Sequence, residues 1–360
     1  MSVARNSAWA RRERRLGAAA DLSVPPFRAR WPWIGGDLQT LRLFLRPPSV
    51  DLGPWPARRL WLAMPDGDAL PVELHAEAAL GARPLILLIH GLTGCADSHY
   101  LRASARMWLD AGYPVARLNL RGSLPARPRC AGHYHAGRSA DLADALAVLL
   151  RQVPAAVGAG IVPMGYSLGG NMLIKFLAEA GARFPVRAAG TVSAPLDLAA
   201  TSARFLARRN TMYHAWLLRA MKREALRPPA QVSPAERAAI LNARSVRDFD
   251  DGFVAPRHGF ADAADYYARC SARRFLPEVP VPLLALHAQD DPWIPARAYD
   301  EAVWDTGRGQ GAVLTVGGGH VGFHGAGRAT AWHDRALYDF ITCVLYRETR
   351  PAGDMRACKT

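Results

Sequence analysis

Ser167 lies in Gly165-Tyr166-Ser167-Leu168-Gly169, a G-x-S-x-G pattern. The buried-strand pattern of residues 160–166 precedes it, and apolar residues with helical spacing follow it at Leu173, Phe176, Leu177 and Ala180. A serine on such a strand-to-helix turn is held with its hydroxyl exposed above the sheet, and the flanking glycines remove side chains that would collide there. The pattern in this context predicts that Ser167 is a nucleophile.

Candidates for an acid and a base follow later predicted strands. Asp290 and Asp291 come shortly after the apolar run 281–287, and His320 follows three glycines directly after the last predicted strand. A carboxylate that accepts the Nδ1 proton of a histidine fixes its tautomer and stabilises the imidazolium. The chain order serine, aspartate, histidine fits a nucleophile of this kind. We expect Asp291 to be the acid because it lies four residues before Pro295, a spacing usual for the acid in folds of this kind. Asp290 is the alternative. Both carboxylates could instead cap the next helix.

An ester-cleaving serine also needs backbone N–H groups that stabilise the negative oxygen formed on the substrate. Leu168, directly after the nucleophile, is expected to supply one of them. Leu92, in the segment His90-Gly91-Leu92-Thr93-Gly94, is expected to supply the other. We expect His90 to be a structural hydrogen-bonding residue and not a base.

Three other groups of residues are weaker candidates for a metal or phosphate site. His133 and His135 have a spacing that could ligate a metal, but no third ligand is placed nearby, so we expect them to shape the edge of the site. The acidic run 248–251 is expected to anchor a cap to the core. The glycines 317–319 lack the Gly-Lys-Ser/Thr sequence of a phosphate loop. No cofactor and no metal are therefore expected.

The wider pattern alternates strands and helices. The uninterrupted apolar run 84–90 is typical of a strand buried on both faces of a parallel sheet. Predicted strands and helices then alternate through residue 194, and strands resume at 281–287 and 312–316 before a closing helix over 329–347. This pattern predicts an α/β fold, a mostly parallel, doubly wound sheet of about eight strands, with ligands at the carboxyl ends of the strands.

The alternation stops between the two halves of the sheet. Residues 197–279 have helical, amphipathic patterning and no strand, which predicts a helical cap insertion. The core is expected at 31–196 and 280–348. We further expect a basic, loosely ordered tail over 1–30 and a C-terminal tail over 349–360.

The composition limits the classes of binding partner that we expect. The 360 residues include 45 Lys+Arg and 31 Asp+Glu, a net charge of +14, but the arginines are scattered and no basic stripe with interleaved aromatics is present. We therefore expect no nucleic-acid partner, and at most weak peripheral association with an anionic membrane. No run approaches the roughly 18 apolar residues of a membrane span. Five widely spaced cysteines suggest free thiols and a cytoplasmic location.

Several stretches together resemble one family. The chain is similar to the YheT-like branch of the α/β-hydrolase superfamily, which includes medium-chain ethyl ester synthases/esterases and phospholipases. The matching stretches occur in the family's order: GGDLQTL (35–41), HGLTG with Tyr100, NLRG (119–122), YHAG (134–137) with Asp141, GYSLGGNMLIKFL (165–177), RDFD (247–250), HGF with DYY (258–267), DDP (290–292) and GGHVGF (318–323). The chain departs from the family at Asp37, Ser123, Cys95 and Ala96.

The resemblance implies the α/β-hydrolase fold and a triad of Ser167, Asp291 and His320. It also implies a serine carboxylic-ester hydrolase that acts on a small-molecule ester with a short or medium apolar acyl chain. The same triad fits an alcohol O-acyltransferase or a lipid-directed phospholipase. A non-catalytic ligand-binding pseudo-hydrolase is a lesser alternative.

Overall fold

The computed structural model describes residues 12–22, 24–327 and 329–348. Their strands form a single nine-stranded sheet in the order β1-β9-β8-β7-β6-β4-β5-β3-β2. The six strands from β9 to β5 are parallel, and β1, β2 and β3 pair antiparallel at the two edges. The bounds of the strands are β1 Arg14–Gly17, β2 Arg58–Ala63, β3 Ala69–His75, β4 Leu85–Ile89, β5 Val115–Leu118, β6 Ile161–Tyr166, β7 Ala189–Val192, β8 Leu283–Ala288 and β9 Gln310–Thr315. The predicted fold class is confirmed.

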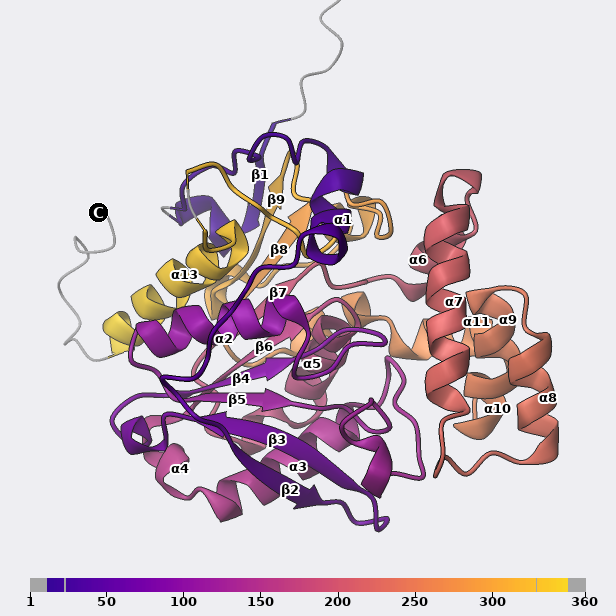
Figure 1. The fold of residues 1–360 in the computed structure, drawn as a ribbon. Coiled ribbons are helices and arrows are strands. Elements are labelled where there is room, and N and C mark those ends of the chain that lie inside the picture. Colours follow the sequence, from indigo (N-terminus) through magenta and orange to yellow (C-terminus); the bar gives the residue numbers. More distant parts are fainter. Residues whose placement is uncertain (1–11, 23, 328, 349–360) are drawn as a thin grey trace, which may run out of the picture.

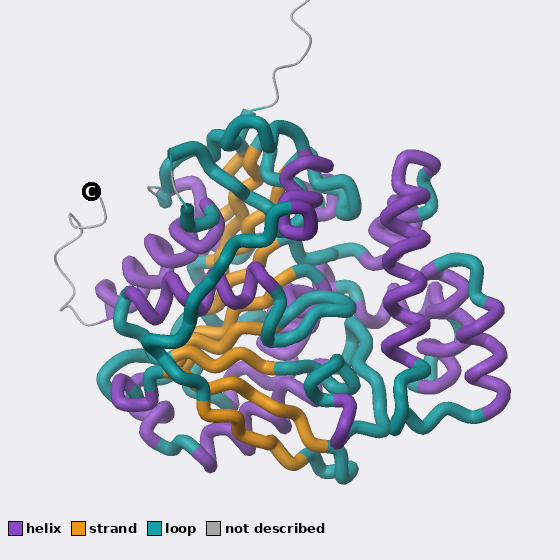
Figure 2. Tube along the Cα trace, in the orientation of Figure 1, coloured by secondary structure: helices purple, strands orange, loops and turns teal. Residues whose placement is uncertain are grey.

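Helices cover both faces of this sheet (Figures 1 and 2). Helices α2 (His99–Asp110) and α13 (Trp332–Glu348) lie on one face, and α3 (Ser139–Gln152) and α5 (Leu168–Ala180) lie on the other. Alternate residues of β4 point to the two faces: Ile86 and Leu88 belong to one core, and the other three strand residues belong to the second. Burial on both faces explains why β4 is apolar throughout.

Between β7 and β8 the chain forms helices and no strand. These inserted helices form a separate block beside the carboxyl ends of the parallel strands (Figure 1). Their bounds are α6 Leu198–Phe205, α7 Thr211–Ala225, α8 Pro234–Asn242, α9 Val246–Phe249, α10 Ala255–Arg257 and α11 Ala263–Cys270. The remaining α-helices are α1 Gly36–Leu45, α4 Ala155–Ala159 and α12 Arg297–Asp300.

The N-terminal segment differs from its prediction. Residues 1–11 and 23 lie outside the described residues, but Arg14–Gly17 form β1, which pairs with β9. The Arg15 guanidinium stabilises the turn that follows by donating hydrogen bonds to the carbonyl oxygens of Leu22 and Val24. The prediction of a loosely ordered tail is therefore wrong for residues 14–17. The strand was missed because backbone pairing at a sheet edge does not require a strong hydrophobic pattern in the sequence. The expected tail at 349–360 lies outside the described residues.

The cysteines also differ in part from the prediction. Cys95, Cys130 and Cys270 are free, but Cys343 is disulfide-bonded. The prediction that all cysteines are free thiols was therefore wrong. Cys358 lies outside the described residues. Among the described helices, none is both long enough and apolar enough to span a membrane.

Candidate active site

Ser167 occupies the sharp turn between β6 and α5. Its backbone has φ 51° and ψ −125°, a conformation that residues with a side chain rarely adopt. Glycine on either side allows the close crossing of strand and helix. A Cβ at Gly165 would lie 2.5 Å from the Gly169 carbonyl oxygen, and a Cβ at Gly169 would lie 2.4 Å from the His90 carbonyl oxygen. The turn is therefore strained, and its packing excludes any side chain at these two positions.

A continuous hydrogen-bond chain starts at this serine. The Ser167 Oγ lies 2.9 Å from His320 Nε2, and His320 Nδ1 lies 2.9 Å from Asp291 Oδ2. The backbone N–H of His320 donates to Thr40 Oγ1 at 2.8 Å, which ties the histidine loop to α1. The Trp293 ring lies against the imidazole, with 4.3 Å between ring centroids. The fold thus brings together the three residues that the sequence singled out.

The two neighbouring aspartates have different contacts. Asp291 is buried, and its Oδ1 accepts hydrogen bonds from the backbone N–H groups of Trp293 and Ile294, at 2.8 and 3.0 Å. Asp290 instead accepts the backbone N–H of Gly319 at 2.9 Å and so supports the loop that carries the histidine. Asp291 is therefore the aspartate that hydrogen-bonds the imidazole, at 2.9 Å.

The environment of Asp291 favours its charged form. Burial works to raise the pKa of this carboxyl, but His320, His287 and the Trp293 N–H outweigh burial, and the net result is a lowered pKa. His287 lies behind Asp291, with its Nδ1 3.9 Å from Asp291 Oδ2, and stacks on the Tyr299 ring. Burial lowers the pKa of His287 to about 4, so this ring is neutral at neutral pH. The sequence did not single out His287.

The loop after β4 lies directly against the serine. A Cβ at Gly91 would lie 2.8 Å from the Cβ of Ser167, so only glycine allows this approach. Within the described part of the chain, the backbone N–H groups of Leu92 and Leu168 donate no hydrogen bond. Two N–H groups beside the serine are therefore unused by the fold.

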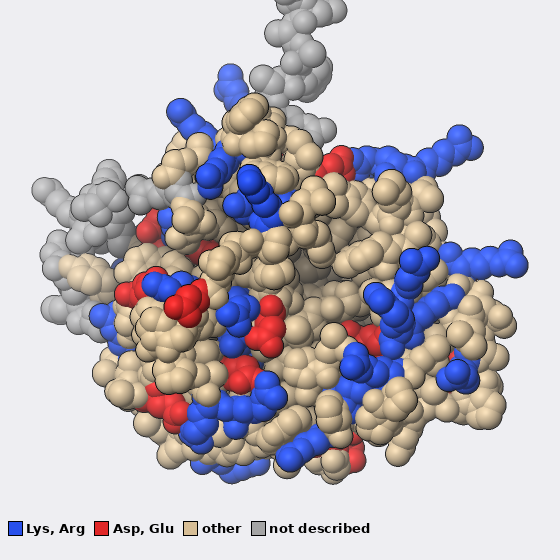
Figure 3. Space-filling view, viewed as in Figure 1, with Lys and Arg blue, Asp and Glu red and all other residues tan. Residues whose placement is uncertain are grey.

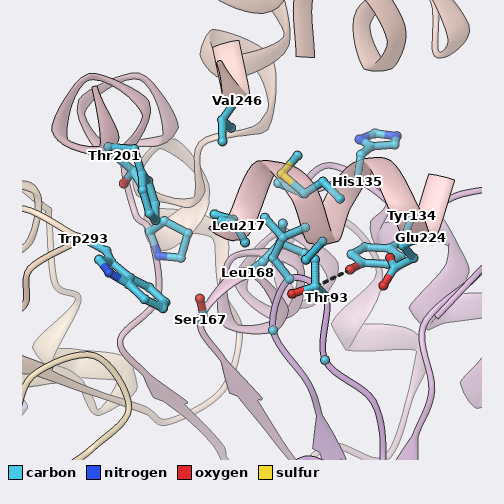
Figure 4. Close-up of a pocket in the computed structure, with 18 of the residues that line it drawn as sticks. Thr93, Tyr134, His135, Ser167, Leu168, Thr201, Leu217, Glu224, Val246 and Trp293 are labelled. Carbon is cyan, nitrogen blue, oxygen red and sulfur yellow. Dashed lines mark hydrogen bonds between the residues drawn. The ribbon is translucent and has the colours of Figure 1, made fainter. Parts of the chain in front are cut away.

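Several side chains hold this loop in place, and Arg117 is one of them, since its guanidinium donates to the Ala96 carbonyl oxygen. Tyr100 Oη accepts the N–H of Gly91 at 2.9 Å, and Tyr134 Oη accepts the N–H of Thr93 at 2.7 Å (Figure 4). Asn119 Oδ1 accepts the N–H of Ala96 at 2.8 Å. His90 accepts the N–H of Leu120 at Nε2 (2.9 Å), and its Nδ1 lies 2.8 Å from the Gly91 carbonyl oxygen.

Burial lowers the pKa of His90 to about 4, so this ring is neutral. Because Nε2 accepts from Leu120, the proton sits on Nδ1, which donates to the Gly91 oxygen. The structural role predicted for His90 is confirmed.

Comparison with known proteins gives the family. A family profile described as alpha/beta hydrolase fold matches residues 84–326. YheT of Escherichia coli (strain K12), provisionally named an esterase, is 34% identical over 318 residues, which cover 86% of this chain and 90% of YheT. The chain belongs to the α/β-hydrolase fold family. Within that family it lies in the YheT-like branch, as its motifs predicted.

Two further relatives of this α/β hydrolase are more distant. Phospholipase ABHD3 of Mus musculus is 27% identical over 267 residues, which cover 73% of the chain but only 64% of ABHD3. Among solved structures, the Pyrococcus furiosus esterase Pf2001 superposes with a TM-score of 0.55 at 15% identity, over 90% of this chain and 97% of Pf2001. That likeness shows the shared fold.

The family motifs away from the serine build a buried ion cluster in this hydrolase. Arg121, from the NLRG motif, is buried and makes two hydrogen bonds to the Asp141 carboxylate, at 2.8 and 2.9 Å, and a further one to Asp68. Asp68 also accepts the backbone N–H groups of Ala131 and Gly132, at 2.7 and 3.1 Å. The cluster therefore fixes the segment that leads into Tyr134, one of the residues that hold the loop after β4.

A cavity of about 400 Å³ opens above Ser167. The inserted helices supply most of its apolar lining, and Figure 4 shows Leu217 directly above the serine with Trp293 to one side and Tyr134 to the other. The larger apolar lining residues from these helices include Leu198, Phe205, Trp216, Leu217, Met221, Val246 and Phe249, and Phe253 and Val254 come from the short segment between α9 and α10. The cavity can hold an apolar chain beside the serine.

Two buried histidines of this hydrolase also reach the cavity. His133 and His135 line its edge, as predicted, and burial lowers their pKa values to about 4 and about 2. Among the described residues, no group of three or more His, Cys, Asp or Glu is placed to hold a metal.

The acidic run 248–251 was expected to anchor a cap to the core, and this expectation was wrong. Asp250 accepts the hydroxyl of Tyr267 at 2.7 Å, and Asp251 accepts the N–H of Ala263 at 2.9 Å. Both partners lie on α11, so the run joins inserted helices to one another. Sequence does not show which inserted helices are adjacent, so it did not indicate the partners of these two carboxylates.

Proposed function

We propose that this chain is a serine carboxylic-ester hydrolase with Ser167 as nucleophile, His320 as general base and acid, and Asp291 as the acid that orients the histidine. The observation that carries the proposal is the hydrogen-bond chain from Ser167 through His320 to Asp291 at the floor of an apolar cavity. A strained serine turn and two unused N–H groups beside it support the same assignment.

The proposed reaction has two stages. Ser167 Oγ bonds to the ester carbonyl carbon while its proton moves to His320 Nε2, and the N–H groups of Leu92 and Leu168 bind the resulting oxyanion. The oxyanion then reforms the carbonyl, the bond to the alkoxide breaks, and the alkoxide takes the proton from His320. Water repeats the sequence on the acyl-enzyme and releases the carboxylic acid. Ionised Asp291 stabilises the imidazolium formed in each stage.

The substrate we propose is an ester with a short or medium apolar acyl chain. The apolar walls from the inserted helices motivate this choice, because burial of each methylene stabilises binding by about 0.8 kcal/mol. Relatives named phospholipase ABHD3 and monoacylglycerol lipase favour lipid esters as a second candidate class. An alcohol that attacks the acyl-enzyme in place of water would make the same site an acyltransferase.

The test is hydrolysis of p-nitrophenyl esters over a series of acyl chain lengths. We expect a rate maximum at an intermediate length, and no hydrolysis by Ser167→Ala. Leu217→Trp, which fills the cavity above the serine, should move the maximum to shorter chains, and Leu241→Trp, at an exposed position outside the cavity, should not. Turnover by Ser167→Ala at the wild-type rate would contradict the proposal. Added alcohol that diverts product from acid to ester would identify acyl transfer.

A further inference from the structure

Exposed apolar side chains are concentrated in two segments that border the cavity. Of fourteen exposed large hydrophobic residues in the described chain, eight lie in two segments, residues 31–45 and residues 206–216, called here the rim. Trp31 is 79% exposed and Met212 is 86% exposed. The other six are Ile34, Leu38, Phe44, Leu45, Leu206 and Trp216. Scattered exposed hydrophobics are ordinary on a protein surface, but a cluster around a cavity mouth indicates an interaction site.

The two rim segments meet at the cavity mouth. Phe44 and Trp216 both line the cavity and are exposed, and their rings contact each other with 5.3 Å between centroids. Asp37 of α1 accepts hydrogen bonds from Arg209 (2.8 Å) and from the Tyr213 hydroxyl (3.1 Å). The rim therefore joins α1 to the inserted helices and borders the cavity that contains Ser167.

The rim is also strongly cationic. Residues 28–46 contain four arginines, and residues 204–223 contain six Lys or Arg, against a single acidic residue, Asp37. Figure 3 shows the hollow on this face of the molecule with Lys and Arg side chains around it. The exposed arginines of these stretches are Arg28, Arg30, Arg46, Arg204, Arg208, Arg209, Arg219 and Arg223. An apolar, aromatic surface flanked by arginine matches the chemistry of an anionic lipid interface.

We propose that the rim docks on an anionic lipid surface. The exposed apolar side chains enter the headgroup region, the arginines contact lipid phosphates, and the cavity mouth faces the membrane. An acyl ester then reaches Ser167 without its apolar chain crossing water. This last step rests on the proposed function, but docking itself requires no turnover.

The test is co-sedimentation of full-length Ser167→Ala protein with vesicles of phosphatidylcholine alone or of an equimolar mixture with phosphatidylglycerol. We expect at least about tenfold tighter binding to the anionic vesicles, and a comparable loss on raising the salt from about 0.1 M to about 0.5 M. Two variants test the rim. The apolar variant is Trp31→Ser/Ile34→Ser/Met212→Ser, and the charge variant is Arg46→Gln/Arg208→Gln/Arg219→Gln. Each is expected to weaken binding at least about tenfold.

Matched controls lie away from the rim. Val157→Ser/Leu241→Ser/Val303→Ser removes three exposed apolar groups elsewhere, and Arg151→Gln/Arg183→Gln/Arg237→Gln removes three exposed cations elsewhere. Both should bind anionic vesicles like the parent, and thermal unfolding checks that every variant folds. Equal losses in rim and control variants, or equally salt-sensitive binding to duplex DNA, would overturn the proposal. Dimerisation in solution that the rim variants abolish would assign the surface to a second copy of the chain and overturn it as well.

The two proposals fail separately. Absence of vesicle binding in a protein that hydrolyses soluble esters overturns docking and leaves the hydrolase intact. Vesicle binding by a wild-type protein that hydrolyses no ester overturns the proposed function and leaves docking intact.

Discussion

The backbone N–H of Thr93 donates a 2.7 Å hydrogen bond to the hydroxyl of Tyr134. Thr93 has φ 57°, a left-handed conformation that is costly for a β-branched residue, and it directly follows Leu92. On its other side, Tyr134 lies beside Glu224 of α7, whose pKa is raised by burial to about 7 (Figure 4). A helix of the insertion thus packs on the tyrosine that holds the loop proposed to bind the oxyanion.

Tyr134→Phe should lower kcat while leaving KM nearly unchanged. The variant removes the acceptor of the Thr93 N–H, so the strained loop can relax and the Leu92 N–H shifts away from the oxyanion. Removal of a whole oxyanion donor costs about 10²–10³ in kcat, so a displaced donor should cost about tenfold. Steady-state kinetics on a soluble ester measures both constants.

Tyr267→Phe is the matched control for this change. Its hydroxyl also contacts a buried carboxyl group at the cavity, that of Asp250, but has no contact with the loop after β4. We expect kcat close to wild type. Similar losses of kcat in both variants would show that Tyr134 acts only through packing.

Asp291→Asn and Asp290→Asn should separate the two aspartates. An asparagine at 291 no longer stabilises the imidazolium and favours the wrong tautomer of His320, so kcat should fall by about 10⁴. An asparagine at 290 keeps an oxygen that can accept the Gly319 N–H, so kcat should stay within about tenfold of wild type. A larger loss at 290 than at 291 would reverse the assignment of the acid.

Gly91→Ala should reduce kcat/KM by about a hundredfold in a folded protein. The new methyl group would lie 2.8 Å from the Cβ of Ser167, and relief of that contact must displace either the nucleophile or the loop. A misplacement of about 1 Å costs on the order of 10² in rate. Gly158→Ala is the control, because a Cβ there meets no atom within 4 Å. Wild-type activity in Gly91→Ala would show that the loop does not pack on the serine as described.

Asp334→Asn should make stability less sensitive to pH. Burial raises the pKa of Asp334 from 3.8 to about 7, although the hydroxyls of Ser104 and Tyr166 partly oppose the shift. The folded state therefore holds a proton that the unfolded state releases. Binding of that proton contributes to the free energy of unfolding in full below about pH 4, and the contribution is lost as the pH rises through about 7.

Asparagine keeps an acceptor for Ser104 and does not ionise. The melting temperature of the wild type should therefore fall more than that of Asp334→Asn between pH 5 and pH 8, by roughly a few degrees. Asp250 and Glu224, whose pKa values are also raised to about 7, are present in both proteins and cancel in the comparison. Parallel pH curves from calorimetry would contradict the buried, protonated Asp334.

The sequence predicted the fold class and the residues that meet at the serine because their signals are local. A buried parallel strand such as β4 must be apolar on both faces, and a serine between two close-packed elements needs glycine on either side. The aspartate and histidine follow strands whose carboxyl ends meet at one edge of the sheet, so their positions directly after predicted strands were enough to predict that they lie near Ser167.

Long-range contacts were beyond the sequence. Tyr134 holds the loop through a partner 41 residues away, and Arg121 pairs with Asp68 across 53 residues. The family motifs included Tyr134 and Arg121 without indicating what these residues contact. Strand β1 was missed because its order depends on pairing with β9, almost three hundred residues later. Helix α1 was not predicted, because its exposed apolar side chains obscure the usual amphipathic pattern.

The most direct test of the central claim is intact-mass measurement after incubation with a fluorophosphonate probe. An activated Ser167 should gain one covalent phosphonyl group per chain, with loss of fluoride. Ser167→Ala should gain none, and His320→Ala should react far more slowly because the serine loses its base. Absence of labelling in folded wild-type protein, or equal labelling in Ser167→Ala, would contradict the assignment of Ser167 as the nucleophile.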